Sequence, residues 1–332
     1  MHFQQHSVER FQGLHNVGVC RLPSSEVRYI GDPIMPLNDT FPKAIVFIVG
    51  EYEKDGVIHK GVVGTGFLVL FPSSVAGKGY IYVCTSAHVV RPLIRSWIQL
   101  NKKAGGVEPV PVHTWFYHPS NDIADDVAVS PMRGSADYDY RLLPMNLFID
   151  AYGGARLGNR VYFIGLLGQM KNMVAKNIPM VRGGTVGALN QEGVPIEIAP
   201  GTTINVKAHL MDCRSFGGFS GSPCFVQADG ISLTGEGGEA AIGWASSTFL
   251  LGLLIAHFDV NKPATLTGEL ASISGKVEMP INTGVGVVLP IERLRELLME
   301  EKQLAGERKK MDEQLVSQEK QSAATPDLAT DY

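Results

Sequence analysis

The chain has 332 residues, of which 45% are hydrophobic and 19% are charged, and its formal net charge is −4. This balance is that of an ordinary globular protein with room for two domains, and it excludes a chain basic enough to follow nucleic acid. The longest apolar run, 249–258, is about half of the roughly 20 residues that a membrane span requires. We therefore expect no nucleic-acid partner and no membrane partner.

The first half of the chain is rich in strand signals. Short runs with β-branched residues, separated by Gly, Pro, Asn or Asp, occur at 43–53, 61–71, 79–86 and 126–132. After a joint near 132–158, the same pattern returns at 159–168, 183–190, 202–210, 222–230, 248–258 and 283–291. Two β halves are therefore predicted to follow one another as barrels or sandwiches.

From Pro290 the composition changes to helix formers. Leucines stand on a rough helical stripe at Leu294, Leu297, Leu298 and Leu304. The last residues, 322–332, have the composition of a disordered tail. We expect an N-terminal extension at 1–40, a first β-barrel at 41–140, a second at 141–298, and a charged helix end with a disordered tail at 299–332.

The four cysteines stand at no CxxC spacing, so we expect buried free thiols rather than a zinc ribbon or a redox pair. His113 and His118 lie near each other on either side of an apolar segment, and loop or surface positions are favoured over a metal pair. No metal and no cofactor are predicted. The first residues lack the apolar core of a signal peptide, so we expect a cytoplasmic location.

One serine stands among unusually small residues. In the segment "GGFSGSPCF" at 217–225, Ser220 has Gly218 two residues before it and Gly221 directly after it. So bare a turn can aim its amide N–H groups at a ligand, although a simple turn between strands gives the same pattern.

A serine hydroxyl needs a neutral imidazole and an orienting carboxylate to become a nucleophile. His88 follows an apolar strand in "VCTSAHVV" at 83–90, and Asp126 precedes the strand "VAV". Asp122 and Asp125 are nearby alternatives for the acid. Each residue alone has a structural interpretation, as a satisfied histidine or as a turn aspartate.

Together, "TSAHVV", "DVAV" and "GFSGSP", in the order His, Asp, Ser, resemble the trypsin-like serine proteases of the chymotrypsin fold. The segments "GTGFLV", "LGNRVYFIG" and "NTGVGVVLPIERL" also look like bacterial trypsin-like peptidases, and the resemblance covers roughly residues 43 to 298. It implies two packed six-stranded antiparallel β-barrels with the active site in the cleft between them, followed here by a C-terminal helix.

The resemblance implies a serine endopeptidase in which Ser220 is the nucleophile, His88 the general base and Asp126 the orienting carboxylate. The backbone N–H groups of Gly218 and Ser220 would form the oxyanion hole. A peptide or protein would be the substrate, and the C-terminal helix could contact a partner or a second copy.

Two departures from secreted relatives are visible. The residue before the nucleophile is Phe219, which cannot form the ion pair with a freed N-terminal amine, so we predict that no N-terminal cleavage is needed for activation. Val89 replaces the cysteine that follows the histidine, which favours a reducing compartment. We also expect no PDZ-like domain after the last barrel strand.

The specificity pocket is less well defined by the sequence. Arg214 and His257 fall in segments that line the pocket in the family, and both could face an acidic substrate side chain. The other interpretation is an apolar pocket with Arg214 turned to solvent.

Two other functions fit parts of the pattern. An inactive member of the fold could keep the groove as a binding module, although the complete His, Asp, Ser and glycine set argues against it. A serine esterase of the α/β-hydrolase class would carry its triad in the order Ser, Asp, His, the reverse of the order here.

Overall fold

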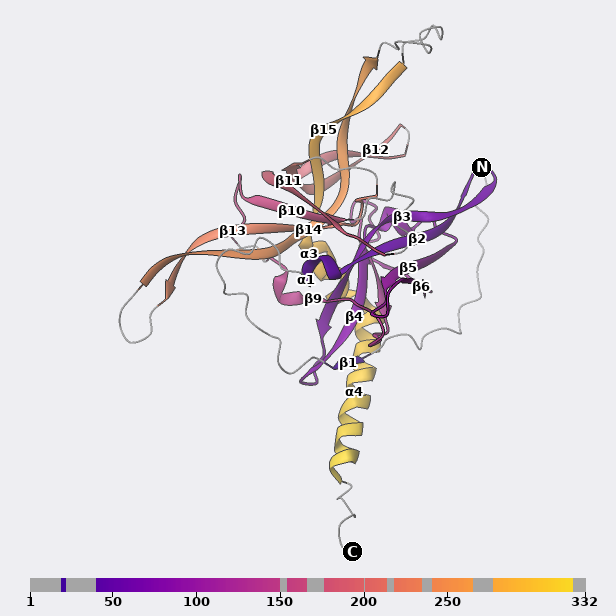
Figure 1. Ribbon diagram of the computed structural model, residues 1–332, viewed down its shortest axis with the longest axis vertical. Coiled ribbons are helices and arrows are strands. Elements are labelled where there is room, and N and C mark those ends of the chain that lie inside the picture. Colours follow the sequence, from indigo (N-terminus) through magenta and orange to yellow (C-terminus); the bar gives the residue numbers. More distant parts are fainter. Residues whose placement is uncertain are drawn as a thin grey trace, which may run out of the picture.

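The computed structural model describes residues 19–21, 40–149, 154–165, 176–199, 201–213, 218–234, 241–264 and 277–324. Within these ranges the protein is all-β, with two antiparallel β halves followed by C-terminal helices (Figure 1). The fold class predicted from the sequence is therefore confirmed.

The first half is a nine-stranded sheet with the order β6-β5-β2-β3-β4-β8-β7, in which β1 pairs with β4 and β9 pairs with β3. Its strands are β1 (Val19–Arg21), β2 (Ile45–Lys54), β3 (Val57–Pro72), β4 (Lys78–Thr85), β5 (Arg95–Asn101), β6 (Val107–Val112), β7 (Phe116–Tyr117), β8 (Ala128–Met132) and β9 (Leu143–Pro144). Two short helices, α1 (Thr40–Lys43) and α2 (Ala87–Val90), and a 3-10 turn η1 (Met145–Leu147) complete this half. The strand number exceeds the expected six because the very short β1, β7 and β9 add to it.

The second half is a closed barrel of six strands in the order β10-β11-β12-β15-β14-β13. The strands are β10 (Arg160–Gly165), β11 (Met180–Ala199), β12 (Thr202–Asp212), β13 (Pro223–Thr234), β14 (Ala241–Ala264) and β15 (Val277–Pro290). The hairpins β13–β14 and β14–β15 extend well away from the body of the barrel (Figure 1).

One hydrophobic core runs through both halves, because inward-facing residues of the first sheet and of the barrel belong to the same buried cluster. Phe41 of α1 meets Phe225 of β13 edge to face, with ring centroids 4.7 Å apart. The two halves are thus packed against each other and not merely linked.

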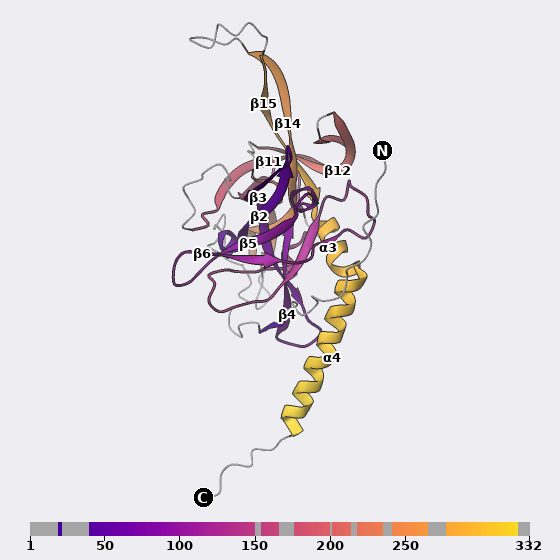
Figure 2. The ribbon, with the colours of Figure 1, turned by 90° about the vertical axis from the view of Figure 1, so that its right-hand side faces the viewer.

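The C-terminal residues form α3 (Ile291–Glu300) and α4 (Lys302–Ala324). Leu294, Leu297, Leu298 and Leu304 are all fully buried, which confirms the predicted stripe. Beyond its packed first turns, α4 extends away from the body in both views (Figures 1 and 2). It includes residues 322–324, which the composition had suggested were disordered, and the rest of the expected tail lies outside the described residues.

None of the described helices is long and apolar enough to cross a membrane.

Candidate active site

Antiparallel pairing of β4 and β8 brings His88 beside Asp126. Thr85 at the end of β4 pairs with Ala128 at the start of β8, so the residues that follow Thr85 run alongside those that precede Ala128. His88 lies in the single turn of α2, where Ala87, Val89 and Val90 are buried and anchor the turn. The histidine side chain is 41% exposed, so it is held by its neighbours while its ring remains accessible.

The carboxylate of Asp126 contacts His88 through both of its oxygens. Oδ1 accepts a hydrogen bond of 2.7 Å from the backbone N–H of His88, and Oδ2 lies 2.6 Å from Nδ1 of the ring. Asp126 is 6% exposed. Because an ionised carboxylate can only accept, Nδ1 carries the proton, and the lone pair of Nε2 faces away from Asp126. This is the tautomer that a general base requires.

The two other candidate aspartates have different partners. Asp122 is exposed and its Oδ1 caps the N–H of Ala124 at 2.9 Å. Asp125 is buried, but its carboxylate contacts Arg293 at 2.9 Å and Ser120 at 2.6 Å. Of the three aspartates, only Asp126 pairs with His88 in the described residues.

The turn with Ser220 is built on two glycines in left-handed backbone conformations, Gly218 with φ +99° and Gly221 with φ +84°. The N–H of Gly221 donates to Leu254 O at 2.9 Å, and Ser222 N–H closes the turn on Phe219 O. A Cβ on Gly221 would overlap Thr65 O and Thr85 Oγ1. Only glycine therefore allows the turn to lie so close to the first sheet.

Thr65 of β3 holds this turn from the other half of the molecule. Its N–H donates to Ser220 O at 3.0 Å, and its hydroxyl donates to Gly218 O at 2.7 Å. The sequence analysis did not identify Thr65 as part of the site. The signal that could have found it is "GTG" at 64–66, a threonine between two glycines in a strand.

Gly64 shows how near the serine turn lies to the histidine turn. A Cβ there would come within 2.6 Å of Val89 Cγ1 and 3.2 Å of Ser220 O. Within the described part of the chain, the hydroxyl of Ser220 makes no hydrogen bond to His88. Catalytic hydrogen bonds are often long in unliganded sites and shorten when substrate binds, so this geometry is compatible with catalysis.

Phe219 anchors the turn in the barrel. Its ring is 1% exposed, and a Cβ on Gly165 of β10 would come within 2.6 Å of it. The guanidinium of Arg182 lies 5.5 Å from the ring centroid. An apolar contact therefore fixes the residue before the serine.

The backbone N–H groups of Gly218 and Ser220 were expected to bind an oxyanion. Neither amide donates a hydrogen bond to another described residue, whereas the carbonyls of both accept bonds from Thr65. The turn thus holds its carbonyls against the first sheet and leaves these two donors available to a ligand.

The structure describes one of the two residues expected to set substrate specificity. Arg214 lies outside the described residues. His257 is exposed on β14, where it pairs with Gly286 of β15.

Cys84, Cys213 and Cys224 are free and buried, as predicted. Burial raises the pKa of the Cys213 thiol to about 11 and those of the other two well above the ordinary value. Thiols so disfavoured as thiolates are poor nucleophiles, so Ser220 has no cysteine competitor among them.

His118 lies in the loop between β7 and β8, and a loop or surface position was expected, but its side chain is buried. It is 8% exposed and lies between the carboxylates of Asp125 and Glu296, while His113 is exposed. The described residues contain no group of three or more His, Cys, Asp or Glu side chains placed to hold a metal ion.

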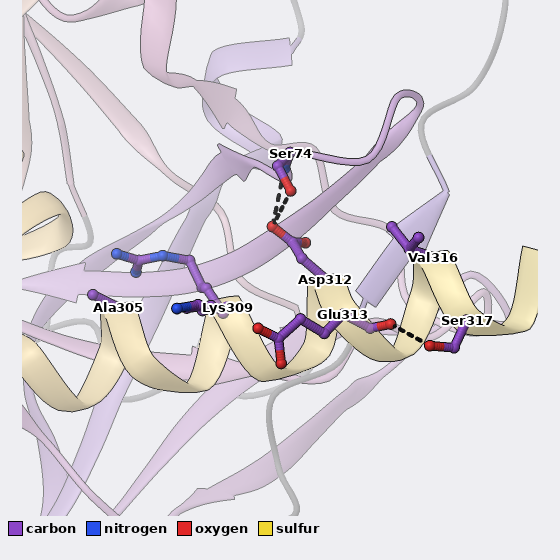
Figure 3. A pocket seen from close by; sticks show the side chains of 8 residues that line it. Ser74, Ala305, Lys309, Asp312, Glu313, Val316 and Ser317 are labelled. Carbon is purple, nitrogen blue, oxygen red and sulfur yellow. Dashed lines mark hydrogen bonds between the residues drawn. The ribbon is translucent and has the colours of Figure 1, made fainter.

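A hollow of about 590 Å³ lies between α4 and the β3–β4 turn (Figure 3). Arg308, Lys309, Asp312 and Glu313 contribute to its lining, with Ser74 bonded to Asp312. None of the candidate catalytic residues lines it, so it is a surface feature of the helix packing and is separate from the candidate site.

No protein-family model matches the chain, and no curated protein matches it. Among solved structures, the protease domain of MamO from Magnetospirillum magneticum (apo form) is 19% identical over 80% of this chain and 100% of its own, with a TM-score of 0.44. The Rv3671c protease of M. tuberculosis (active form) is 16% identical over 88% of this chain and 92% of its own, with a TM-score of 0.43. Human heparin binding protein is 13% identical over 80% of this chain and 92% of its own, with a TM-score of 0.42. These similarities concern the fold alone, and at such TM-scores they carry no argument about activity, so the candidate site is judged on its own geometry.

Proposed function

We propose that this protein is a serine endopeptidase that hydrolyses peptide bonds with Ser220, His88 and Asp126. The observation that carries the proposal is the pairing of Asp126 with His88 through both carboxylate oxygens, next to a glycine-supported serine turn. A buried carboxylate that fixes a half-exposed imidazole in one tautomer leaves Nε2 free to accept a proton, as a general base requires.

Each of these groups has a role in one step of the proposed mechanism. His88 Nε2 takes the proton from the Ser220 hydroxyl as its oxygen attacks the substrate carbonyl, and Asp126 stabilises the imidazolium that forms. The amides of Gly218 and Ser220 donate to the oxyanion, His88 then gives its proton to the leaving amine, and an acyl-enzyme remains. Water activated by the same histidine releases the acyl group.

The conditions of action are also part of the proposal. Free buried thiols support a reducing, cytoplasmic setting, and an apolar anchor at Phe219 supports an enzyme that is active without N-terminal cleavage. We therefore propose that the enzyme cleaves peptides or proteins inside the cell under regulation. The projecting helix α4 offers a surface for a partner or a second copy of the chain.

The test is labelling with a fluorophosphonate probe, followed by hydrolysis of a peptide library. Wild-type protein should label, while Ser220→Ala and His88→Ala should not. Asp126→Asn should lose about 10⁴-fold in kcat because the tautomer is wrong. Matched controls are Ser135→Ala, His113→Ala and Asp122→Asn, which should retain wild-type labelling. His113 and Asp122 are exposed and Ser135 is half-buried.

Absence of labelling in wild-type protein would contradict the proposal and favour the inactive binding module. The library also tests the basic pocket of Arg214 and His257, which predicts enrichment of Asp or Glu before the cleaved bond.

A further inference from the structure

A closed ring of ionisable side chains lies next to the candidate triad. Arg293 Nε is 2.9 Å from Asp125 Oδ1, and Arg293 Nη1 is 2.7 Å from Glu296 Oε2. His118 completes the ring, with Nε2 3.0 Å from the same Glu296 oxygen and Nδ1 3.1 Å from Asp125 Oδ2. The ring joins helix α3 to the loop that precedes β8.

The side chains of this ring are more buried than those of ordinary surface ion pairs. The side chains of His118 and Asp125 are 9% and 12% exposed, and those of Arg293 and Glu296 are about a third exposed. Partial burial by itself would raise the pKa of the Glu296 carboxyl, but hydrogen bonds from Arg293 and His118 lower it below its ordinary value. The carboxylate therefore stays ionised, and each member of the ring has two partners that restrict its rotation.

Asp125 connects the ring to the triad because it directly precedes Asp126. Asp125 N–H donates to Asp122 O at 3.2 Å, and Val127 N–H donates to Asp125 O at 2.8 Å, which closes a tight turn centred on Asp126. The carboxylate of Asp125 is directed to Arg293 and that of Asp126 to His88. A rotation of one residue in so short a turn must move the other.

We propose that Arg293, with Glu296 and His118, is a positioning group that sets the orientation of Asp126 towards His88 by holding Asp125. The role in turnover depends on the proposed serine-protease function, whereas the effect on the His88–Asp126 contact does not. The C-terminal helix is then part of the catalytic support and not only a cover for the barrel.

Helix α3 supplies a matched control. Arg295, two residues from Arg293, also ties the helix to the body, but it donates to Phe148 O at 3.0 Å and Ile149 O at 2.9 Å. Arg293→Gln and Arg295→Gln remove the same charge and a similar anchor from the same helix. Only Arg293→Gln removes a contact with Asp125.

The first measurement is peptide hydrolysis by full-length variants. Arg293→Gln should lower kcat roughly 10- to 100-fold with little change in KM, because a misplacement of up to about 1 Å in a catalytic group costs up to that factor. Arg295→Gln should keep the wild-type kcat, with both thermal midpoints measured to compare stability. In the double variant Arg293→Gln/Glu296→Gln, the losses should be non-additive because the two residues act as one unit.

The second measurement does not depend on activity. The proton on His88 Nδ1, held against Asp126, should give a low-field NMR resonance that is assigned by its loss in His88→Ala. This resonance should shift or broaden in Arg293→Gln and stay unchanged in Arg295→Gln. An unchanged resonance in Arg293→Gln, or an equal loss of kcat in both arginine variants, would overturn the positioning role. A wild-type protein that neither labels nor hydrolyses would refute the proposed function, and the resonance would still decide the inference.

Discussion

The substitution Gly221→Ala should lower both the stability of the protein and the reactivity of Ser220, and the two effects can be measured separately. Its φ of +84° costs an alanine about 1–2 kcal/mol. A Cβ would also overlap Thr65 O and Thr85 Oγ1 and would come within 3.1 Å of the Ser86 nitrogen. The serine turn would therefore have to withdraw from the first sheet by about 1 Å to restore normal contact distances.

Gly56 is the matched control for Gly221. It has a similar φ of +75°, and a Cβ there would meet nothing within 4 Å. The left-handed penalty and the effect of Gly→Ala on the unfolded chain are thus shared by Gly56→Ala and Gly221→Ala. What remains is the overlap at Gly221, which should make Gly221→Ala less stable than Gly56→Ala by about 1–3 kcal/mol.

Urea unfolding and fluorophosphonate labelling measure the two effects on Gly221→Ala and Gly56→Ala. The loss of stability should appear as a lower midpoint with an unchanged m-value. Labelling should slow about 100-fold in Gly221→Ala, since the serine oxygen moves by about 1 Å, and should be unchanged in Gly56→Ala. Equal unfolding free energies and equal labelling rates in the two variants would refute this account of the turn.

Four further predictions concern His209, Phe219, the N-terminal residues and Asp312. Burial lowers the pKa of His209 to about 4, below its ordinary 6.5, so the unfolded chain takes up a proton first as pH falls. The free energy of unfolding should therefore drop between about pH 6.5 and 4, by up to about 1.4 kcal/mol per pH unit. Urea titrations of His209→Asn should show a smaller drop. Phe219→Ala should lower the free energy of unfolding in urea by about 3–5 kcal/mol and slow labelling. Removal of residues 1–40 should leave activity unchanged, and an increase would contradict the apolar anchor. Asp312 accepts hydrogen bonds from Ser73, Ser74 and Tyr80, so Asp312→Ala should speed hydrogen exchange in α4.

Strand-forming runs between turn residues predicted two β halves, and the resemblance to trypsin-like proteases implied the two packed six-stranded barrels. The apolar run at 79–86 ends one residue after β4, and Leu294, Leu297, Leu298 and Leu304 are buried as their spacing indicated. The lengths of several elements were not predictable. Strand β14 begins at Ala241, well before the expected 248, in a glycine-rich segment whose strand character comes from pairing with β13. Helix α4 continues to Ala324 through a charged segment with little amphipathic pattern to indicate it.

The sequence analysis missed the contacts of the site that are made by residues far apart in the chain. The sequence proposed His88, Asp126 and Ser220 from local motifs, and the structure brings His88 against Asp126 through a strand register that no local motif specifies. The sequence placed His118 in a loop or at the surface, and its burial was missed because one of its partners, Glu296, lies 178 positions away. Burial of a polar side chain depends on such a partner, and single-sequence patterns do not reveal it.

The candidate site belongs to neither half of the molecule alone. Thr65 holds both carbonyls of the serine turn from the first sheet, and Ser86, which precedes the histidine turn, donates to Leu254 O of the barrel at 3.3 Å. Because these bonds cross between the halves, the relative placement of Ser220 and His88 depends on how the halves dock. Thr65→Val keeps a β-branched side chain but removes the donor to Gly218 O, so it should leave each half folded while it loosens the turn. Labelling should then slow more than the thermal midpoint falls, and a loss of stability with wild-type labelling would show that the site is held by some other contact.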